Sequence, residues 1–489
     1  MDSTAPEHLD VVVVGAGLSG IAAGHYLRTE CPWASYAVLE GRSGLGGTWD
    51  LFRYPGIRSD SDMHTLGYSF RPWRGEHSIA DGPDILDYLQ ATAADEGIDR
   101  LIRFGHRVRA AEWSSATSTW LLTVDVVGAD GAATTRQLTC GFLFSCAGYY
   151  RYDRGYEPEF DGLDDFGGRV VHPQFWPEDL DVTGRRVVVI GSGATAMTLV
   201  PALARTAGHV TMLQRSPTYV LSRPRRSGLA TALRRTLPRR WADPAVRWLH
   251  ALVTQGFYQV SRRRPAQVRK GLVQRVAQQL PADYDVATHF TPRYDPWDQR
   301  VCVVPDGDLF TAVREGRATV VTDTIDTFTP EGVRLDSGDE LPADVVVTAT
   351  GLELLFLGGV ELVVDGQPVV ASERLTYKGM MLEGVPNLAM AVGYTNASWT
   401  LKAELTCEYV CRILNHLRRT GASAATPRND GAEADPAPLM ALTSGYVTRA
   451  AGTLPQQGSR FPWRVYQSFV KDYRAMRLSK VDDGVVQFS

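Results

Sequence analysis

The chain carries two glycine-rich turns whose spacing suits the binding of a dinucleotide pyrophosphate. The first, Gly15-Ala-Gly17-Leu-Ser-Gly20, lies between an apolar run at 10–14 and a helix predicted over 21–28. In such a turn the first glycine allows the bend, the second lets backbone amides approach the phosphates, and the third lets helix and strand pack closely. The amino end of the helix also attracts the phosphate charge. This arrangement predicts a dinucleotide site.

A carboxylate ends the next predicted strand. That strand covers residues 36–39, and Glu40 follows it, about 20 residues beyond the first turn. A carboxylate at this position accepts hydrogen bonds from ribose hydroxyls and repels a 2′-phosphate. The first site is therefore predicted to hold an unphosphorylated ribose, as in FAD or NAD.

The second turn, Gly191-Ser-Gly193-Ala-Thr-Ala196, follows an apolar run at 186–190. The strand after it, at 210–214, ends in Gln214, Arg215 and Ser216 instead of an acid. Because arginine pairs with a 2′-phosphate, this site is predicted to prefer NADP. The alternative is that Arg215 is a solvated surface charge. Two such sites predict a flavin and the nicotinamide that reduces it, meeting at a domain interface.

The cysteines bear on what a reduced flavin would do next. Reduction of a disulfide needs a close-spaced reactive pair, and the sequence has no CxxC or CxxxxC spacing. Nor does their spacing predict a zinc site, so we expect no metal. The remaining routes are reaction with oxygen and electron transfer to a partner. The six cysteines are Cys31, Cys140, Cys146, Cys302, Cys407 and Cys411.

Two longer strings carry a family resemblance. FGGRVVHPQFWP, at 166–177, fits F-x-G-x-x-x-H-x-x-x-W-P, and GTWDLFRYPGIRSD, at 47–60, follows the first turn. Together they resemble the two fingerprints of the Baeyer–Villiger monooxygenases, the class B flavin monooxygenases, and the resemblance spans nearly the whole chain. The fixed positions of the first string are Phe166, Gly168, His172, Trp176 and Pro177.

The resemblance implies an α/β fold with two Rossmann-like dinucleotide-binding domains and a helical insertion. We expect the FAD-binding domain at 1–148 and 376–489, and the NADP-binding domain at 149–217 and 299–375. The insertion is expected at 218–298. Apolar runs at 142–148 and 345–351, each ending in glycine, fit closing strands of the two domains.

The implied activity uses FAD, NADPH and O₂. In this family a C4a-peroxyflavin inserts one oxygen atom beside a ketone carbonyl to give an ester or lactone, and the same oxidant oxygenates sulfides and related groups, so thioamides are candidate substrates too. The cofactor supplies the nucleophile, so the protein must supply a fixed positive charge. By resemblance this is Arg300, with Asp60 orienting it; a purely structural ion pair is the alternative.

The two turns and the resemblance together define the expected cofactor contacts. Two aromatic residues of the second string have two possible roles: Trp49 and Tyr54 either lie beside the flavin or are core residues. Many relatives carry lysine where this sequence has Gln299, so NADPH preference rests mainly on Arg215 and Ser216. The expected cofactor-binding residues are Gly15, Gly17, Ser19, Gly20, Glu40, Thr48, Trp49, Asp50, Leu51, Arg58, Ser59, Asp60, Val108, Gly191, Ser192, Gly193, Ala194, Thr195, Ala196, Met197, Gln214, Arg215 and Ser216.

The first string also contains a histidine that invites a general-base role. We interpret His172 instead as ordering the linker between the domains while NADP moves in, with Trp176 packing in the same linker. Two rival functions stay open. One is an N- or S-oxygenating flavin-containing monooxygenase, against which Trp176-Pro177 argues; the other is a non-catalytic flavin sensor or electron-transfer module, against which Arg300 argues.

Composition limits the remaining possibilities. With 489 residues the chain is expected to form two or three packed units, and its formal charge of −4 argues against nucleic-acid binding. No signal peptide and no run of about 18 apolar residues is visible, so we expect a reduced, cytoplasmic setting. The arginine-rich stretch from 222 to about 298 fits solvated helix faces or a loose association with anionic membranes.

Overall fold

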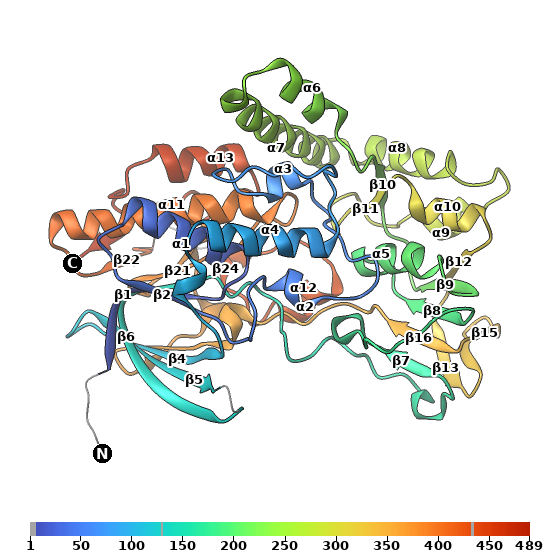
Figure 1. The fold of residues 1–489 in the computed structure, drawn as a ribbon, viewed down its shortest axis with the longest axis horizontal. Helices are drawn as coiled ribbons and strands as arrows, with labels where there is room; N and C mark the ends of the chain where they lie inside the picture. Colours follow the sequence, from blue (N-terminus) through green and yellow to red (C-terminus); the bar gives the residue numbers. More distant parts are fainter. Residues whose placement is uncertain (1–5, 129–130, 432–434) are drawn as a thin grey trace.

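Two β-sheets organise the computed structural model, which describes residues 6–128, 131–431 and 435–489. In Figure 1 the larger sheet and its helices occupy one side of the molecule, the smaller sheet occupies the other, and a group of helices extends above them. The two sheets have separate apolar cores, as expected for two Rossmann-like units. We call the unit built around the larger sheet the first unit and the unit built around the smaller sheet the second unit.

The larger sheet has the order β18-β17-β4-β5-β6-β1-β2-β3, with β21 pairing with β6. The apolar run at 10–14 forms the end of β1, which pairs in parallel with β2 and β6, and α1 (Leu18–Glu30) follows the first turn as predicted. The strands are β1 (Glu7–Val14), β2 (Tyr36–Leu39), β3 (Ile102–Arg103), β4 (His106–Ser114), β5 (Thr119–Val127), β6 (Ala133–Ser145), β17 (Glu361–Val364), β18 (Gln367–Pro368) and β21 (Leu388–Met390).

The position of β17 and β18 corrects the predicted domain boundary. The sequence analysis assigned 299–375 to the NADP-binding domain, but β17 pairs in parallel with β4 of the larger sheet. By pairing there, β17 covers backbone groups that would otherwise be unpaired at the edge of β4. The chain therefore returns to the first unit before residue 361.

The smaller sheet is entirely parallel, with the order β12-β9-β8-β16-β7. Its edge strand β7 comes from the FGGRVVHPQFWP string. Helix α5 (Ala194–Leu203) follows the second glycine turn, and α10 (Asp308–Arg314) packs beside it. The strands are β7 (Arg169–Val171), β8 (Arg186–Ile190), β9 (His209–Gln214), β12 (Ala318–Thr322) and β16 (Val345–Thr348), and a small antiparallel sheet of β13 (Ile325–Thr329), β14 (Gly332–Leu335) and β15 (Glu340–Pro342) lies next to them.

The helical insertion separates β10 (Val220–Arg223) from β11 (Cys302–Pro305), and these two strands pair in parallel. It contains α6 (Gly228–Thr236), α7 (Arg239–Arg263), α8 (Pro265–Ala277) and α9 (Val286–Phe290). The long helix α7 is held against the first unit, because Arg247 forms a buried ion pair with Glu404 and Trp248 packs against Phe469 and Tyr473. The insertion is thus fixed over the first unit by one face of α7.

The C-terminal region completes the first unit. Helix α11 (Trp399–Thr420) packs against α1, and Lys402 on it is held by Asp472, 3.1 Å from its ammonium group. Within the described ranges, no helix is long and apolar enough to cross a bilayer. The remaining α-helices and strands are α2 (Thr48–Leu51), α3 (Met63–Leu66), α4 (Gly82–Asp95), β19 (Thr376–Tyr377), β20 (Met381–Leu382), β22 (Ala425–Pro427), β23 (Ala437–Pro438), α12 (Gly445–Ala450), β24 (Gln456–Gln457), α13 (Phe469–Tyr473) and β25 (Val486–Phe488).

Candidate active site

One cavity of about 1350 Å³ lies between the two units, where both glycine turns open. Most of the residues expected to contact cofactors line it, although they come from distant parts of the chain. These are Gly15, Gly17, Ser19, Glu40, Thr48, Trp49, Leu51, Arg58, Ser59, Asp60, Val108, Gly191, Ser192, Gly193, Ala194, Thr195, Arg215 and Ser216. Arg300, the expected catalytic residue, lines the cavity as well.

Backbone packing at the first turn leaves no room for side chains at the two outer glycines. A Cβ on Gly15, whose φ is +99°, would lie 2.7 Å from the carbonyl oxygen of Cys146, and one on Gly20 would lie 1.8 Å from the carbonyl oxygen of Gly15. Gly17 instead faces Gly47 across a gap in which a Cβ would make an ordinary 3.5 Å contact. Gly17 also caps the amino end of α1. The turn therefore fits a pyrophosphate beside free backbone amides.

Glu40 is held in place by the backbone of the same region. It is buried, and its two carboxylate oxygens accept hydrogen bonds from the amides of Ala16 (2.7 Å) and Arg42 (2.9 Å). These contacts fix a carboxylate at the cavity wall beside the glycine turn, the place expected for a ribose diol.

Arg42 is a cavity residue that the sequence did not predict. Its Nη2 donates to a carboxylate oxygen of Asp50 at 2.7 Å, whereas its Nη1 is buried and has no hydrogen-bond partner among the described residues. Such an orphaned buried donor costs free energy unless another group accepts from it, so it fits an anionic group of the cofactor. Asp50 does not line the cavity but anchors Arg42. The only sequence signal is the proximity of Arg42 to Glu40, which is too common to be decisive.

The second turn repeats this design with more open space. A Cβ on Gly191, with φ +132°, would lie 2.3 Å from the carbonyl oxygen of Ala349, whereas one on Gly193 would meet nothing within 4 Å. Arg215 is exposed at the cavity, with no ion pair or side-chain hydrogen bond among the described residues, and Ser216 lies beside it. A free guanidinium at this position fits a 2′-phosphate.

Five of the expected contacts lie behind the cavity surface. Gln214 is buried and donates from Nε2 to the carbonyl oxygen of His289 (2.8 Å) and to Thr322 (2.9 Å), so it braces the end of β9. Asp50 supports Arg42. The other three support the glycine turns through helix packing: Gly20, Ala196 and Met197.

Arg300 and Asp60 meet at the wall of the cavity. Arg300 precedes β11 and Asp60 lies in the loop between α2 and α3, and their Nη2 and Oδ2 atoms are 2.8 Å apart. The carboxylate of Asp60 raises the pKa of Arg300 further above its ordinary value. About a third of each side chain is accessible, 32% for Arg300 and 36% for Asp60, and both line the cavity. The pair thus presents a permanent cation to whatever binds there.

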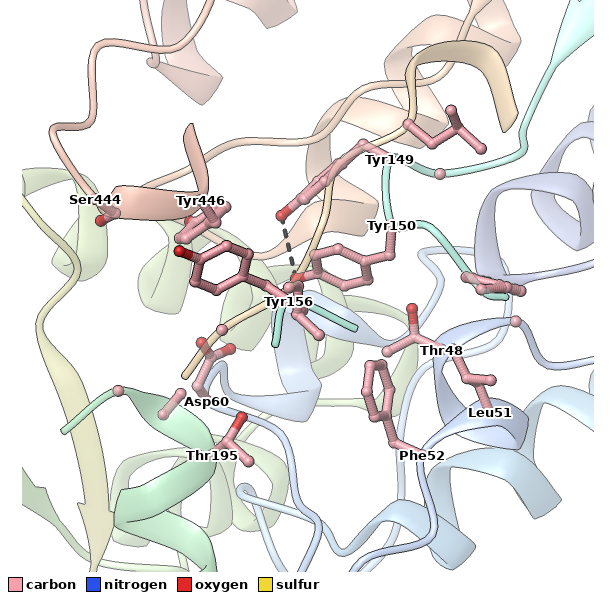
Figure 2. A pocket seen from close by; sticks show the side chains of 18 of the residues that line it. Thr48, Leu51, Phe52, Asp60, Tyr149, Tyr150, Tyr156, Thr195, Ser444 and Tyr446 are labelled. Carbon is pink, nitrogen blue, oxygen red and sulfur yellow. Dashed lines mark hydrogen bonds between the residues drawn. The ribbon is translucent and has the colours of Figure 1, made fainter. Parts of the chain in front are cut away.

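Four tyrosines line the cavity near this ion pair. Figure 2 shows Tyr149, Tyr150, Tyr156 and Tyr446 gathered on one side of Asp60, with Thr48, Leu51 and Phe52 across the cavity. The hydroxyls of Tyr149 and Tyr150 are 3.3 Å apart, and burial raises the pKa of Tyr150 to about 12. Burial also raises the pKa of Tyr149, so both of these hydroxyls are neutral O–H donors at physiological pH.

The sequence analysis missed these tyrosines for different reasons. Tyr149 and Tyr150 directly follow Gly148, which ends the predicted closing strand, so their position was a usable signal. Tyr446 reaches the site from α12 through a long-range contact, in which the amide of Thr443 donates to the carbonyl oxygen of Asp298 at 2.8 Å. No local pattern indicates that contact.

The FGGRVVHPQFWP string lies outside the cavity wall. His172 is buried, burial lowers its pKa, and its Nδ1 accepts a hydrogen bond from the amide of Gln174 at 3.2 Å. Gln174 in turn donates to the carbonyl oxygens of Arg151 (2.9 Å) and Tyr152 (3.1 Å) in the connecting segment. These contacts suit the interpretation of His172 as a linker residue, which stays a prediction.

The other residues of the string have packing roles. Phe166 is buried beside β16, and a Cβ on Gly168 would lie 2.5 Å from the Phe166 ring. Trp176 packs against the core of the smaller sheet, and Pro177 is half-buried next to it. The string therefore shapes the edge of the second unit.

Three residues of the second string connect the two units or line the cavity between them. Arg58 forms an ion pair with Asp308 of α10, with Nη1 and Oδ2 2.5 Å apart, and donates to the carbonyl oxygen of Met197 at 3.3 Å. Trp49 both lines the cavity and packs against the two main cores, and Tyr54 is buried at the wall. Both aromatics therefore pack into the protein and also line the cavity, and their position beside a flavin stays a prediction.

Comparison with known proteins agrees with this geometry. Residues 75–244 match the flavin-binding monooxygenase-like family, and residues 13–75 match an NAD(P)-binding Rossmann-like domain. The chain is 54% identical over 484 residues to the FAD-containing monooxygenase EthA of Mycobacterium tuberculosis, covering 99% of this chain and 98% of EthA. It is 48% identical to the putative FAD-containing monooxygenase MymA of the same species, covering 99% and 98%.

A solved structure extends the comparison to the fold. An oxidized steroid monooxygenase bound to NADP superposes with a TM-score of 0.76 at 22% identity, covering 98% of this chain and 99% of that one. At that identity the likeness concerns the fold, and it confirms the predicted α/β architecture.

Proposed function

The chain belongs to the flavin-binding monooxygenase family that includes EthA and MymA of Mycobacterium tuberculosis, and from this membership we propose that it is an FAD- and NADPH-dependent Baeyer–Villiger monooxygenase. It would insert one oxygen atom from O₂ beside a ketone carbonyl to give an ester or lactone, and would also oxygenate sulfides or thioamides. The observation that carries the proposal is the Arg300–Asp60 pair, which faces the cavity between two dinucleotide cradles.

The residues at the first turn suit FAD. Gly17 and the amino end of α1 would hold the pyrophosphate, Glu40 would accept from the ribose, and the orphaned Nη1 of Arg42 would find an acceptor. When bound and reduced, FAD supplies the electrons that activate oxygen. Gly193 and Arg215, at the second turn, would hold NADP.

Arg300 would stabilise the negative charge that develops on oxygen beside the reacting carbonyl. A cation placed in advance in a partly enclosed site acts more strongly than the same charge in water. Asp60 keeps the guanidinium charged and oriented, and the tyrosine hydroxyls nearby are donors that would position a polar substrate atom. No side chain needs to act as the nucleophile.

The experiment that tests the proposal is incubation with NADPH, ¹⁸O₂ and a panel of linear, cyclic and aryl ketones. We expect substrate-stimulated NADPH consumption and one labelled oxygen in the ester product. If sulfides give labelled sulfoxide and no ketone gives ester, the enzyme is the alternative, an N- or S-oxygenating flavin-containing monooxygenase. If no substrate stimulates NADPH consumption, the catalytic proposal is wrong.

Replacing Arg215 tests the preference for NADPH. We expect Arg215→Ala to raise the KM for NADPH about 10- to 100-fold and to change the KM for NADH less than twofold, because a charge-assisted pair with the 2′-phosphate is worth roughly 1.5–3 kcal/mol. Steady-state NADPH and NADH oxidation measures both constants. Arg205→Ala, at another exposed arginine of the same unit, is the control. An equal rise for both nucleotides would show that Arg215 does not contact the phosphate.

A further inference from the structure

The helical insertion has a charge opposite to that of the whole chain. Residues 222–279 contain 14 arginine and lysine residues and one acidic residue, Asp243, a formal charge of +13, whereas the chain as a whole carries −4. The positive charge is therefore concentrated in one part of the molecule, and Figure 1 shows α6 and α7 at its outer edge.

Only some of these cations have a carboxylate partner. Arg225, Arg226, Arg234, Arg247 and Arg262 form ion pairs with acidic residues. Seven exposed cations have no ion-pair partner among the described residues: Arg235, Arg239, Arg240, Arg263, Arg264, Lys270 and Arg275.

Exposed apolar side chains gather on the same helices. Of the thirteen large apolar residues that are exposed in the described chain, six lie between 229 and 260, so they are clustered and not scattered over the surface. Trp241 is 62% exposed, and the other five are Leu229, Leu237, Leu252, Val253 and Val260. Clustered exposed apolar groups mark an interaction surface.

Helical periodicity places the apolar residues of α7 on the side away from the protein. Trp241 and Leu252 are separated by close to three turns, and Val253 and Val260 by close to two, so all four fall within about a third of the helix circumference. Arg247 and Ala251, which are turned towards the first unit, lie on the opposite side. Helix α7 therefore has two distinct faces. One face docks on the first unit, and the opposite face, which carries the exposed apolar residues, is free.

From these observations we propose that α6 and α7 form a surface that binds anionic lipid bilayers. We define this surface as the apolar residues Leu229, Leu237, Trp241, Leu252, Val253 and Val260 with the unpaired arginines Arg235, Arg239, Arg240, Arg263 and Arg264. An apolar stripe flanked by arginines is the pattern of a helix that lies in a membrane interface. Each arginine near an anionic surface contributes on the order of 1 kcal/mol, so the surface binds reversibly.

Charge favours a lipid surface over a second copy of this chain. A two-fold contact through this surface would place the unpaired arginines of one copy close to those of the other, since the same patch is used on both sides. Anionic headgroups would neutralise them instead. The proposal does not depend on the proposed reaction, because vesicle binding needs neither substrate nor turnover.

Vesicle co-sedimentation of the flavin-loaded protein tests this surface. We expect binding to phosphatidylglycerol-containing vesicles, weak binding to pure phosphatidylcholine vesicles, and a marked decrease in high salt. Arg239→Glu with Arg240→Glu, and separately Trp241→Ala with Leu252→Ser, should each lower the partition coefficient at least tenfold. The matched controls are Arg100→Glu with Arg205→Glu, and Val127→Ser with Leu478→Ser, which change exposed residues elsewhere.

Flavin content and melting temperature establish that the variants are folded. Equal binding to neutral and anionic vesicles, or equal losses in the controls and the surface variants, would overturn the proposal. Light scattering tests the remaining alternative, which is that the surface is an interface between copies of this chain. If the surface variants abolish self-association while the parent protein does not bind vesicles, the surface is an interface between copies and the lipid proposal is wrong.

Discussion

Replacing Arg300 by alanine is expected to leave flavin reduction by NADPH largely intact and to lower ester formation by at least 10³-fold. Removing a single neutral donor from an oxyanion site already costs about 10²–10³ in rate, and Arg300 contributes a full charge. Asp60 would then remain as an uncompensated carboxylate beside the reacting oxygen, since the two side chains are 2.8 Å apart. The substitution thus changes the sign of the local field as well as its strength.

Two measurements separate reduction from oxygen transfer. Anaerobic stopped-flow absorbance follows bleaching of the flavin by NADPH, and product analysis follows the ester. Arg300→Lys, which keeps the charge without the planar fork, should retain part of the activity. Arg334→Ala, at an exposed arginine paired with Asp326 at 2.8 Å, is the control and should change neither rate. Undiminished ester formation in Arg300→Ala would exclude Arg300 from the reaction.

Asp60 is expected to act through Arg300. Its carboxylate raises the pKa of Arg300 and lies at hydrogen-bonding distance from the guanidinium. It is therefore a positioning residue, and an amide at position 60 would keep the contact while removing the charge that holds the guanidinium in place.

The parts of the site that follow from local backbone constraints could be predicted from the sequence. Gly15, Gly20 and Gly191 are required because a Cβ at each position would collide with a carbonyl oxygen, and such constraints appear as fixed spacings. The place of Arg215 at the cavity was predictable because it directly follows strand β9, whose end lies beside the second glycine turn. In each case the functional residue and the element that positions it are neighbours in the chain.

The parts that depend on long-range packing could not be predicted in this way. Strand β17 reads as an apolar strand, but nothing in its own sequence shows that it pairs with β4 instead of extending the smaller sheet. Tyr446 reaches the cavity because the segment near Thr443 contacts Asp298. These placements result from contacts between segments that are far apart in the chain. A single sequence shows no pattern that indicates such contacts.

The two glycine turns differ at their third position in a way that gives a matched test. The first turn has Gly20, where a Cβ would lie 1.8 Å from the carbonyl oxygen of Gly15, and the second has Ala196, whose side chain is fully buried without such a conflict. Helix α5 therefore accommodates the methyl group at Ala196 that α1 has no room for at Gly20. The same motif position is intolerant in one unit and tolerant in the other.

Gly20→Ala is accordingly expected to lose most of its FAD, with less than about a tenth of the protein retaining flavin. The methyl group would have to move α1 away from β1 by more than 1 Å, and overpacking of this kind costs about 1–3 kcal/mol or more before the loss of the phosphate contacts at Gly17 is counted. The reverse change in the second unit, Ala196→Gly, removes a small side chain from a helix and should cost only about 1 kcal/mol. The flavin-to-protein absorbance ratio and the melting temperature measure both variants. Full flavin content in Gly20→Ala would show that α1 can shift without disturbing the pyrophosphate, and the close approach of helix and strand would then not be what the third glycine provides.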